Sequence, residues 1–167
     1  MDDAAQSQDG FADAFESAFA RLRIRIETAC AGQGDWPAGT AAGIHAALTF
    51  AAADPAAARA LTSDALAAGK AGFARYERLI SYLCDLLRPG RRESDVEPLP
   101  AETERALTGG VAMLVAQRID LDRHAELPEL AAEAAQFVLT PYLGMDEARR
   151  VAVANLNRGW DEARPQR

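Results

Sequence analysis

The sequence has few of the residues that form disulfides, metal sites and β-sheets. Its 167 residues include two cysteines, two histidines and one lysine, and aromatic residues make up 7%. Cys30 and Cys84 lack the CxxC spacing of redox and zinc sites, so we expect two reduced thiols in the core. Two histidines are too few for a multi-histidine metal site, and the scarcity of aromatic and β-branched residues disfavours an all-β fold.

Membrane and export signals are also missing. No apolar run approaches the roughly 18 residues that a membrane-spanning helix needs. The N-terminus, Met1-Asp2-Asp3-Ala4, is acidic and lacks the basic and apolar regions of a signal peptide. The 25 acidic and 18 basic residues give a net charge of −7, which disfavours attraction to nucleic-acid phosphates and anionic lipids. We therefore expect a cytoplasmic protein without a membrane partner.

Short motifs for catalysis and cofactor binding are absent. The sequence contains no GxSxG elbow, no GxxxxGK[ST] loop, no GxGxxG turn and no HExxH pair. Residues 120–124 resemble the start of a calcium loop, but Ala125 stands where that loop needs glycine, which favours a solvated turn. Lys70, the single lysine, lies in a glycine-flanked connection without the burial that activates an amine. We therefore expect no enzymatic activity, no metal site and no cofactor.

The residues that are abundant favour helices. Alanine, the strongest helix former, supplies nearly a quarter of the chain, and the length suits one domain with a buried core. Phe11, Phe15, Phe19, Leu22 and Ile26 recur three and four positions apart, which places them on one helical face. No strand or hairpin pattern is present. The sequence predicts an all-α antiparallel bundle of about seven helices, over residues 9–31, from 35 onward, 54–66, 73–87, 100–121, 127–143 and 146–156.

Acidic residues followed by proline mark two of the predicted helix starts. Asp35-Trp36-Pro37 and Asp54-Pro55 each place an N-cap carboxylate before a proline in the first turn. The side chain of an aspartate at this position accepts hydrogen bonds from free amides of the first turn. Both starts are therefore predicted from local chemistry as well as from periodicity.

Other segments lack a helical pattern or interrupt one. Residues 91–100 combine proline with charge and are expected to form a solvated loop, and residues 159–167 read as a polar tail. Gly109 and Gly110 lie inside the fifth predicted helix, where each costs roughly 1 kcal/mol relative to alanine. Such a cost is tolerable where another backbone must approach closely.

Several short stretches follow one another in an order that points to a family resemblance. They are residues 11–22, Asp35-Trp36-Pro37, Asp54-Pro55 with Ala58-Arg59, residues 107–110, residues 127–130, and residues 137–144 with Glu147-Ala148. The Pro-Tyr-Leu-Gly ending at 141–144 is the most specific part. On these residues, the segment 11–151 resembles the C-terminal regulatory domain of the tetracycline-repressor-like (TetR) transcription regulators.

The resemblance implies a helical domain, here residues 11–158, that binds a small apolar or amphipathic effector inside the bundle. The effector pocket would lie among the second, fourth and fifth predicted helices. Its candidate lining residues are His45, Leu48, Phe73, Tyr76, Ile80, Met113 and Gln117. Such a set is mostly apolar with a few polar groups, as in small-molecule sites, and the alternative is that these side chains fill an ordinary core.

The resemblance also implies a homodimer that pairs the fifth and sixth predicted helices of each chain in a four-helix bundle. The candidate interface residues are Leu107, Gly110, Leu114, Leu130, Ala134, Phe137, Val138 and Pro141. They offer more apolar surface than one domain can cover, and obligate interfaces commonly bury about 2,000 Å² or more. We therefore expect a stable dimer at micromolar concentration.

Family members bind operator DNA through an N-terminal three-helix head, which would precede Phe11. Residues 1–10 are too few for a helix-turn-helix, which needs about 20 residues. We expect no specific DNA binding by these 167 residues, and DNA as a partner only where such a head precedes them. A start codon further upstream and a naturally head-less protein both fit this observation. Two other functions stay open: a standalone helical dimer that acts as a binding or scaffold protein, and an enzyme that uses the pocket.

Overall fold

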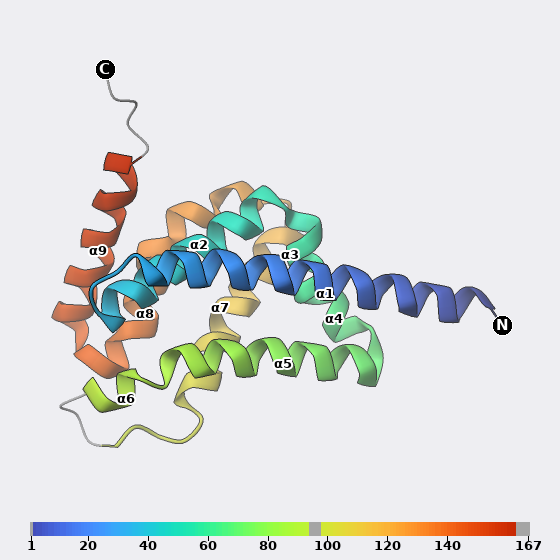
Figure 1. Cartoon of the computed structure of the whole chain (residues 1–167), viewed down its shortest axis with the longest axis horizontal. Helices are drawn as coiled ribbons and strands as arrows, with labels where there is room; N and C mark the ends of the chain where they lie inside the picture. Colours follow the sequence, from blue (N-terminus) through green and yellow to red (C-terminus); the bar gives the residue numbers. More distant parts are fainter. Residues whose placement is uncertain (1, 94–97, 163–167) are drawn as a thin grey trace.

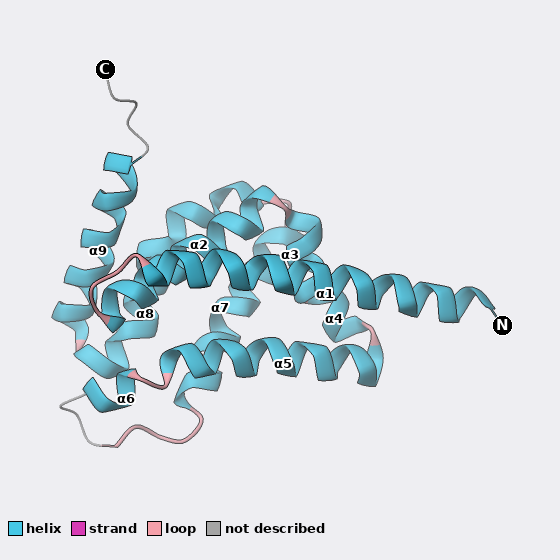
Figure 2. Ribbon diagram, in the orientation of Figure 1, coloured by secondary structure: helices cyan, strands magenta, loops and turns pink. Residues whose placement is uncertain are grey.

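The computed structural model describes residues 2–93 and 98–162, with side chains for 10–93 and 98–155. All regular structure in these ranges is helical, which confirms the predicted all-α class for them (Figure 2). The elements are α1 (Asp2–Ala31), α2 (Trp36–Ala53), α3 (Pro55–Leu61), α4 (Ser63–Ala67), α5 (Gly69–Leu87), α6 (Gly90–Glu93), α7 (Thr103–Asp120), the 3-10 helix η1 (His124–Leu130), α8 (Ala131–Leu143) and α9 (Met145–Glu162). None of these helices is both long enough and apolar enough to cross a lipid bilayer.

Both terminal helices are longer than predicted. The helix α1 begins at Asp2 rather than near residue 9, and α9 continues to Glu162, into the predicted polar tail. Extending a helix that is already nucleated costs much less than starting one, which explains both extensions. Residues 163–167 of the predicted tail lie outside the described residues.

Several internal boundaries also differ from the prediction. The fourth predicted helix begins at Gly69, as α5, rather than at Phe73, so Lys70 lies in its first turn and not in a connection. The predicted loop over 91–100 begins as part of α6, and its residues 94–97 lie outside the described residues. The predicted third helix is divided between α3 and α4 at Thr62, whose hydroxyl donates to the Ala58 carbonyl oxygen at 2.8 Å. Residues 127–130, predicted as the start of the sixth helix, belong to the 3-10 helix η1, which contains Pro128.

The long helices α1 and α5 run along the length of the molecule, and α9 stands across one end (Figure 1). The first turns of α1 extend beyond α4 and α5, away from the other helices (Figure 1). The remaining part of α1 packs on α2, α8 pairs with α9, and α7 lies against α5. This arrangement brings the C-terminal ends of α1 and α5 close to the start of α2.

The predicted caps and the predicted apolar face of the first helix are confirmed. Asp35 accepts a hydrogen bond from the Ala38 amide at 2.8 Å, and Asp54 accepts one from the Ala57 amide at 3.0 Å. The face of α1 that packs into the core carries the buried side chains of Phe15, Phe19, Leu22 and Ile26. They share one core cluster with Leu61 of α3 and Leu79 of α5. Periodicity therefore identified the main contact surface of α1.

An ion pair between the buried Glu104 and the half-buried Arg91 joins α6 and α7, and Tyr142 links it to α8. The Glu104 carboxylate accepts from Arg91 Nε and Nη2, both at 2.6 Å, and from the Tyr142 hydroxyl at 3.3 Å. Arg91 also donates to the carbonyl oxygens of Leu99 at 2.8 Å and Pro100 at 2.7 Å. The hydrogen bonds from Arg91 hold the pKa of Glu104 below its usual range, and burial raises the pKa of Tyr142. These contacts fix the chain that leads into α7.

Candidate ligand-binding cavity

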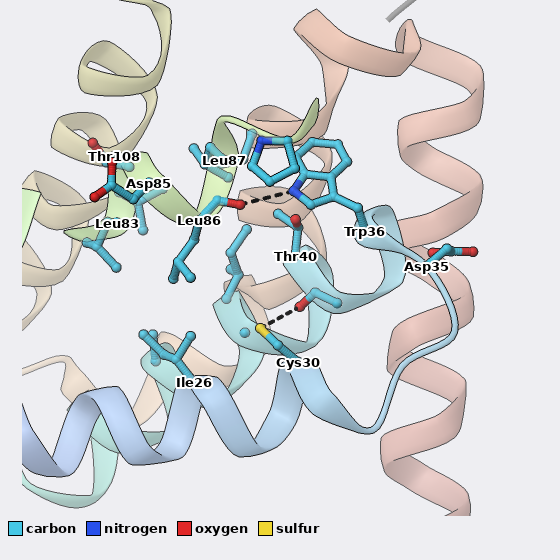
Figure 3. Close-up of a pocket in the computed structure, with 17 residues that line it drawn as sticks. Ile26, Cys30, Asp35, Trp36, Thr40, Leu83, Asp85, Leu86, Leu87 and Thr108 are labelled. Atoms are coloured by element: carbon cyan, nitrogen blue, oxygen red, sulfur yellow. Dashed lines mark hydrogen bonds between the residues drawn. The ribbon is translucent and has the colours of Figure 1, made fainter. Parts of the chain in front are cut away.

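A cavity of about 340 Å³ opens where five helices meet, between the end of α1, the first half of α2 and the end of α5 (Figure 3). The helices α7 and α8 complete its wall. The lining residues are Ile26, Cys30, Asp35, Trp36, Gly39, Thr40, Gly43, Ile44, Ala47, Leu83, Asp85, Leu86, Leu87, Pro89, Thr108, Val111 and Val138. Most of these side chains are apolar, and the volume lies within the range of small-molecule sites.

Two glycines of α2 let the end of α1 approach closely. An ideal Cβ atom at Gly43 would lie 3.1 Å from Cys30 Sγ and 3.3 Å from Ile26 Cγ2, which is tighter than ordinary van der Waals contact. One turn earlier, the Cys30 thiol donates to the carbonyl oxygen of Gly39 at 3.3 Å (Figure 3). The close approach gives the cavity a floor that is made of α1 and α2 together.

Trp36 forms the opposite side of the cavity and ties three elements together. Its indole Nε1 donates to the Leu86 carbonyl oxygen at 3.0 Å (Figure 3). Its ring meets Tyr142 edge to face, with ring centroids 5.1 Å apart. A Cβ atom at Gly90 would overlap the Trp36 ring, so glycine is required there by the close approach. The indole is thus held between α5, α6 and α8.

No charged side chain of residues 10–93 or 98–155 is directed into the cavity. Within these ranges, Asp35 and Asp85 are the only charged residues among its lining residues. The Asp35 carboxylate caps α2, and the side chain points away from the cavity (Figure 3). Asp85 forms an exposed ion pair with Arg88 at 2.6 Å. The polar atoms that remain for a ligand are the hydroxyls of Thr40 and Thr108 and the thiol of Cys30.

The Cys30 thiol is in a poor environment for a nucleophile. Burial raises the pKa of Cys30, and the nearby Glu27 carboxylate raises it further. We expect iodoacetamide to alkylate Cys30 at pH 7.5 several-fold more slowly than a cysteine in an unstructured peptide, because little thiolate is present. The rate should keep rising above pH 9 and should fall when a ligand fills the cavity. Mass spectrometry of the modified peptides measures this, and rapid alkylation of Cys30 at pH 7.5 would contradict it.

The seven residues predicted to line an effector pocket do not line this cavity. Leu48 and Ile80 are buried in core clusters, and Tyr76 packs beside Ile80. Phe73, Met113 and Gln117 are exposed, and His45 lines an open groove on the outer side of α1 and α2. The predicted helices do contribute to the cavity, but with other faces than expected. Neighbouring positions on a helix point about 100° apart, so residues close to the predicted ones in sequence can line the cavity while the predicted ones do not.

A regular spacing in α2 indicates the residues that line this cavity. Trp36, Thr40, Gly43, Ile44 and Ala47 recur three and four positions apart, so they share one helical face. Two of these residues are glycine and threonine, which a search for hydrophobic residues ignores. The Asp35-Trp36-Pro37 start was recognised as a cap, and the role of its tryptophan in the cavity was missed.

The candidate interface residues are divided between the core and the surface. Leu107, Ala134 and Val138 are buried, while Leu114, Leu130 and Pro141 are half-buried and Gly110 and Phe137 are exposed. A hollow of about 270 Å³ on the α7–α8 face brings five of them together, namely Gly110, Leu114, Leu130, Ala134 and Phe137. Val138 instead lines the cavity, and Leu107 packs in the core with Leu87 and Tyr142.

The described residues contain no group of three or more histidine, cysteine, aspartate or glutamate side chains placed to hold a metal ion. The chemistry available in the cavity is therefore apolar contact and hydrogen bonding by hydroxyl and thiol groups. Comparisons of this chain with models of protein families, with curated proteins and with solved structures give no match.

Proposed function

We propose that this chain is the effector-binding and dimerisation portion of a TetR-like transcription regulator. The observation that carries the proposal is the apolar cavity between α1, α2, α5, α7 and α8. Protein interiors are close-packed and contain few voids larger than a water molecule. A lined space of about 340 Å³ therefore suits a small apolar or amphipathic effector better than it suits a structural core.

The position of the cavity supports a two-state response to an effector. Its wall includes the last turns of α1 and α5 and the first turns of α2, which come from distant parts of the sequence. An effector that binds one arrangement of these helices more tightly shifts the population toward that arrangement. The size of the shift is set by the difference in affinity between the two arrangements.

The α7–α8 face supports the proposed homodimer. Phe137 is more than half exposed, and Met113 and Leu121 of the α7 region are exposed as well. Beyond the backbone of α7 itself, a Cβ atom added at Gly110 would have the Phe137 ring at 3.5 Å as its nearest neighbour among the described residues, and one added at Gly109 would have none within 4 Å. The two glycines lower the helical stability of α7, and no close contact within the described chain explains why glycine stands at these positions. Close approach of a second copy supplies such a reason, and in a two-fold dimer the same face meets itself.

A fluorescent probe tests the cavity. N-phenyl-1-naphthylamine is neutral and apolar, and Trp36 lies in the cavity wall, so Trp36 emission should be transferred to the bound probe. We expect one probe per chain in a Trp160→Phe background. The substitution Ala47→Phe, which places a ring in the cavity, should weaken binding by about 10-fold or more, since the added ring excludes the probe.

The matched control is Ala46→Phe on the neighbouring position of α2, which faces the outer groove. It should bind the probe as the parent chain does. Circular dichroism and a melting curve establish that both variants are folded. Equal probe affinity in the two folded variants, or no saturable binding by the parent chain, would contradict the proposed function.

A further inference from the structure

The groups around the cavity are arranged so that a charged ligand finds no partner inside it. Among the residues whose side chains the structure describes, Asp35 and Asp85 are the only carboxylates in the lining, and no lysine, arginine or histidine belongs to it. Both carboxylates are already engaged, one with the Ala38 amide and one with Arg88. An anion would therefore meet negative charge at the rim and no positive charge within.

A cationic ligand would also find no favourable partner inside the cavity. The interior acceptors are neutral oxygen and sulfur atoms, and the Cys30 thiol is protonated and donates to Gly39. Transfer of a charged group from water into such surroundings is costly unless an opposite charge or several hydrogen bonds compensate it. The lining offers apolar contact over most of its surface and compensation for only a small uncharged polar group.

Two buried hydroxyls can provide that compensation. Thr40 of α2 and Thr108 of α7 both line the cavity and are both buried. The Thr108 hydroxyl donates to the Glu104 carbonyl oxygen at 2.8 Å and contacts Cys84 Sγ at 3.5 Å, so toward a ligand it can act only as an acceptor, through its remaining lone pair. The Thr40 side chain extends from α2 between Trp36 and Leu86 in the view of Figure 3 and can donate or accept.

We propose that the cavity selects uncharged ligands that carry one hydroxyl or carbonyl group on an apolar body, with Thr40 as the hydrogen-bond partner of that group. Anions and cations with the same apolar body are rejected. This inference rests on the proposed function and specifies the chemical class of its effector. It follows from the missing countercharge and from the two hydroxyls, and not from the volume of the cavity.

The test compares three ligands with one apolar chain and different head groups. They are 1-decanol, decanoate and decylammonium, each titrated at pH 7.5 while it displaces N-phenyl-1-naphthylamine. The alcohol is kept below its solubility limit, and the two ions are kept below their micellar concentrations. We expect 1-decanol to bind about 10-fold or more tightly than either ion. The apolar chain is nearly the same in all three ligands, so the difference in affinity reflects the cost of burying an uncompensated charge.

A matched pair of substitutions tests the hydrogen bond. Thr40→Val removes the cavity hydroxyl at constant shape, and Thr49→Val makes the same change at an exposed position of the same helix. We expect Thr40→Val to weaken 1-decanol binding by about 3-fold to 10-fold and to leave decanoate binding unchanged. Thr49→Val should change neither value.

The outcomes separate this inference from the proposed function. The first outcome is that decanoate or decylammonium binds as tightly as 1-decanol and loses this binding in Ala47→Phe. That result would overturn the proposed selectivity and leave the proposed function standing. An unchanged affinity for 1-decanol in Thr40→Val would overturn the role of Thr40. A parent chain that binds neither the probe nor any of the three ligands would overturn both proposals.

Discussion

Replacing Glu104 with alanine is expected to lower the free energy of unfolding by about 2 kcal/mol or more, since it leaves the half-buried Arg91 guanidinium and the buried Tyr142 hydroxyl without their acceptor. The Glu104 residue is only 5% exposed, and its carboxylate accepts from Arg91 and Tyr142. Without it, the guanidinium loses its countercharge, and the buried Tyr142 hydroxyl loses its acceptor. Urea unfolding followed by circular dichroism, at one fixed protein concentration, measures the change.

The control for this prediction lies two positions earlier in the chain. The side chain of Glu102 is 80% exposed and its only ion pair in the described chain, with Arg105, spans 3.6 Å. Glu102→Ala should change the free energy of unfolding by less than about 0.5 kcal/mol, as exposed ion pairs contribute little. Equal unfolding midpoints for the two alanine variants would show that the buried pair does not stabilise the fold.

The same pair predicts how stability depends on pH. The pKa of Glu104 in the folded chain lies below its ordinary value of 4.5, chiefly because Arg91 donates to the carboxylate. The stabilisation is therefore fully present above pH 4.5 and is lost as the pH falls through the lower, folded-state pKa. Comparing unfolding at pH 7 and pH 3.5, we expect Glu104→Gln to lose less stability on acidification than the parent chain. An equal loss of stability on acidification in the parent chain and in Glu104→Gln would contradict the assignment of this pH dependence to Glu104.

Placing a charge at Phe137 is expected to separate the proposed dimer. Phe137 is 52% exposed and borders the hollow on the α7–α8 face. An aromatic side chain at the centre of an interface commonly contributes 2 kcal/mol or more, so Phe137→Glu should raise the dimer dissociation constant by about 30-fold or more. Light scattering should give twice the chain mass of 17.9 kDa for the parent and a value near the chain mass for the variant.

Phe73→Glu is the matched control, because Phe73 is 51% exposed but lies at the start of α5. It should leave the dimer intact. Gly110→Leu should also separate the dimer, because the added side chain would occupy the hollow beside Phe137, while the nearest ring atom at 3.5 Å leaves room for a Cβ atom within one chain. A parent chain that is monomeric at tens of micromolar, or equal masses for both phenylalanine variants, would exclude this interface.

Local sequence features predicted the parts of the fold that local chemistry determines. The Asp35 and Asp54 caps, the helical face of Phe15 and Phe19, and the break at Gly144 all depend on residues close together in the chain. Gly144 has a positive φ of 76°, which few other residues adopt, and this ends α8. The helix class and most helix boundaries follow from such features.

Contacts between distant residues could not be predicted in the same way. Trp36 meets the Leu86 carbonyl and Tyr142 across separations of 50 residues and more, and no local pattern indicates this. The cavity faces of α2 and α5 depend on the rotation of each helix, which periodicity fixes only where one face is clearly apolar. In α2 nearly every residue is apolar or small, so the sequence did not distinguish the face of Thr40 from the face of His45.

Methyl NMR of the chain with a bound ligand distinguishes whether a small apolar molecule occupies the cavity between α1, α2 and α5, as we propose. An aromatic probe, N-phenyl-1-naphthylamine, shifts the resonances of methyl groups that it touches. We predict large shifts for the cavity methyls of Ile26, Ile44, Leu83, Leu86, Val111 and Val138. We predict none for the exposed methyls of Ile24, Leu66, Leu121 and Val153, of which Ile24 lies in the outer groove. Shifts confined to Ile24, to the α7–α8 hollow at Leu114 and Leu130, or to no methyl group would contradict the claim.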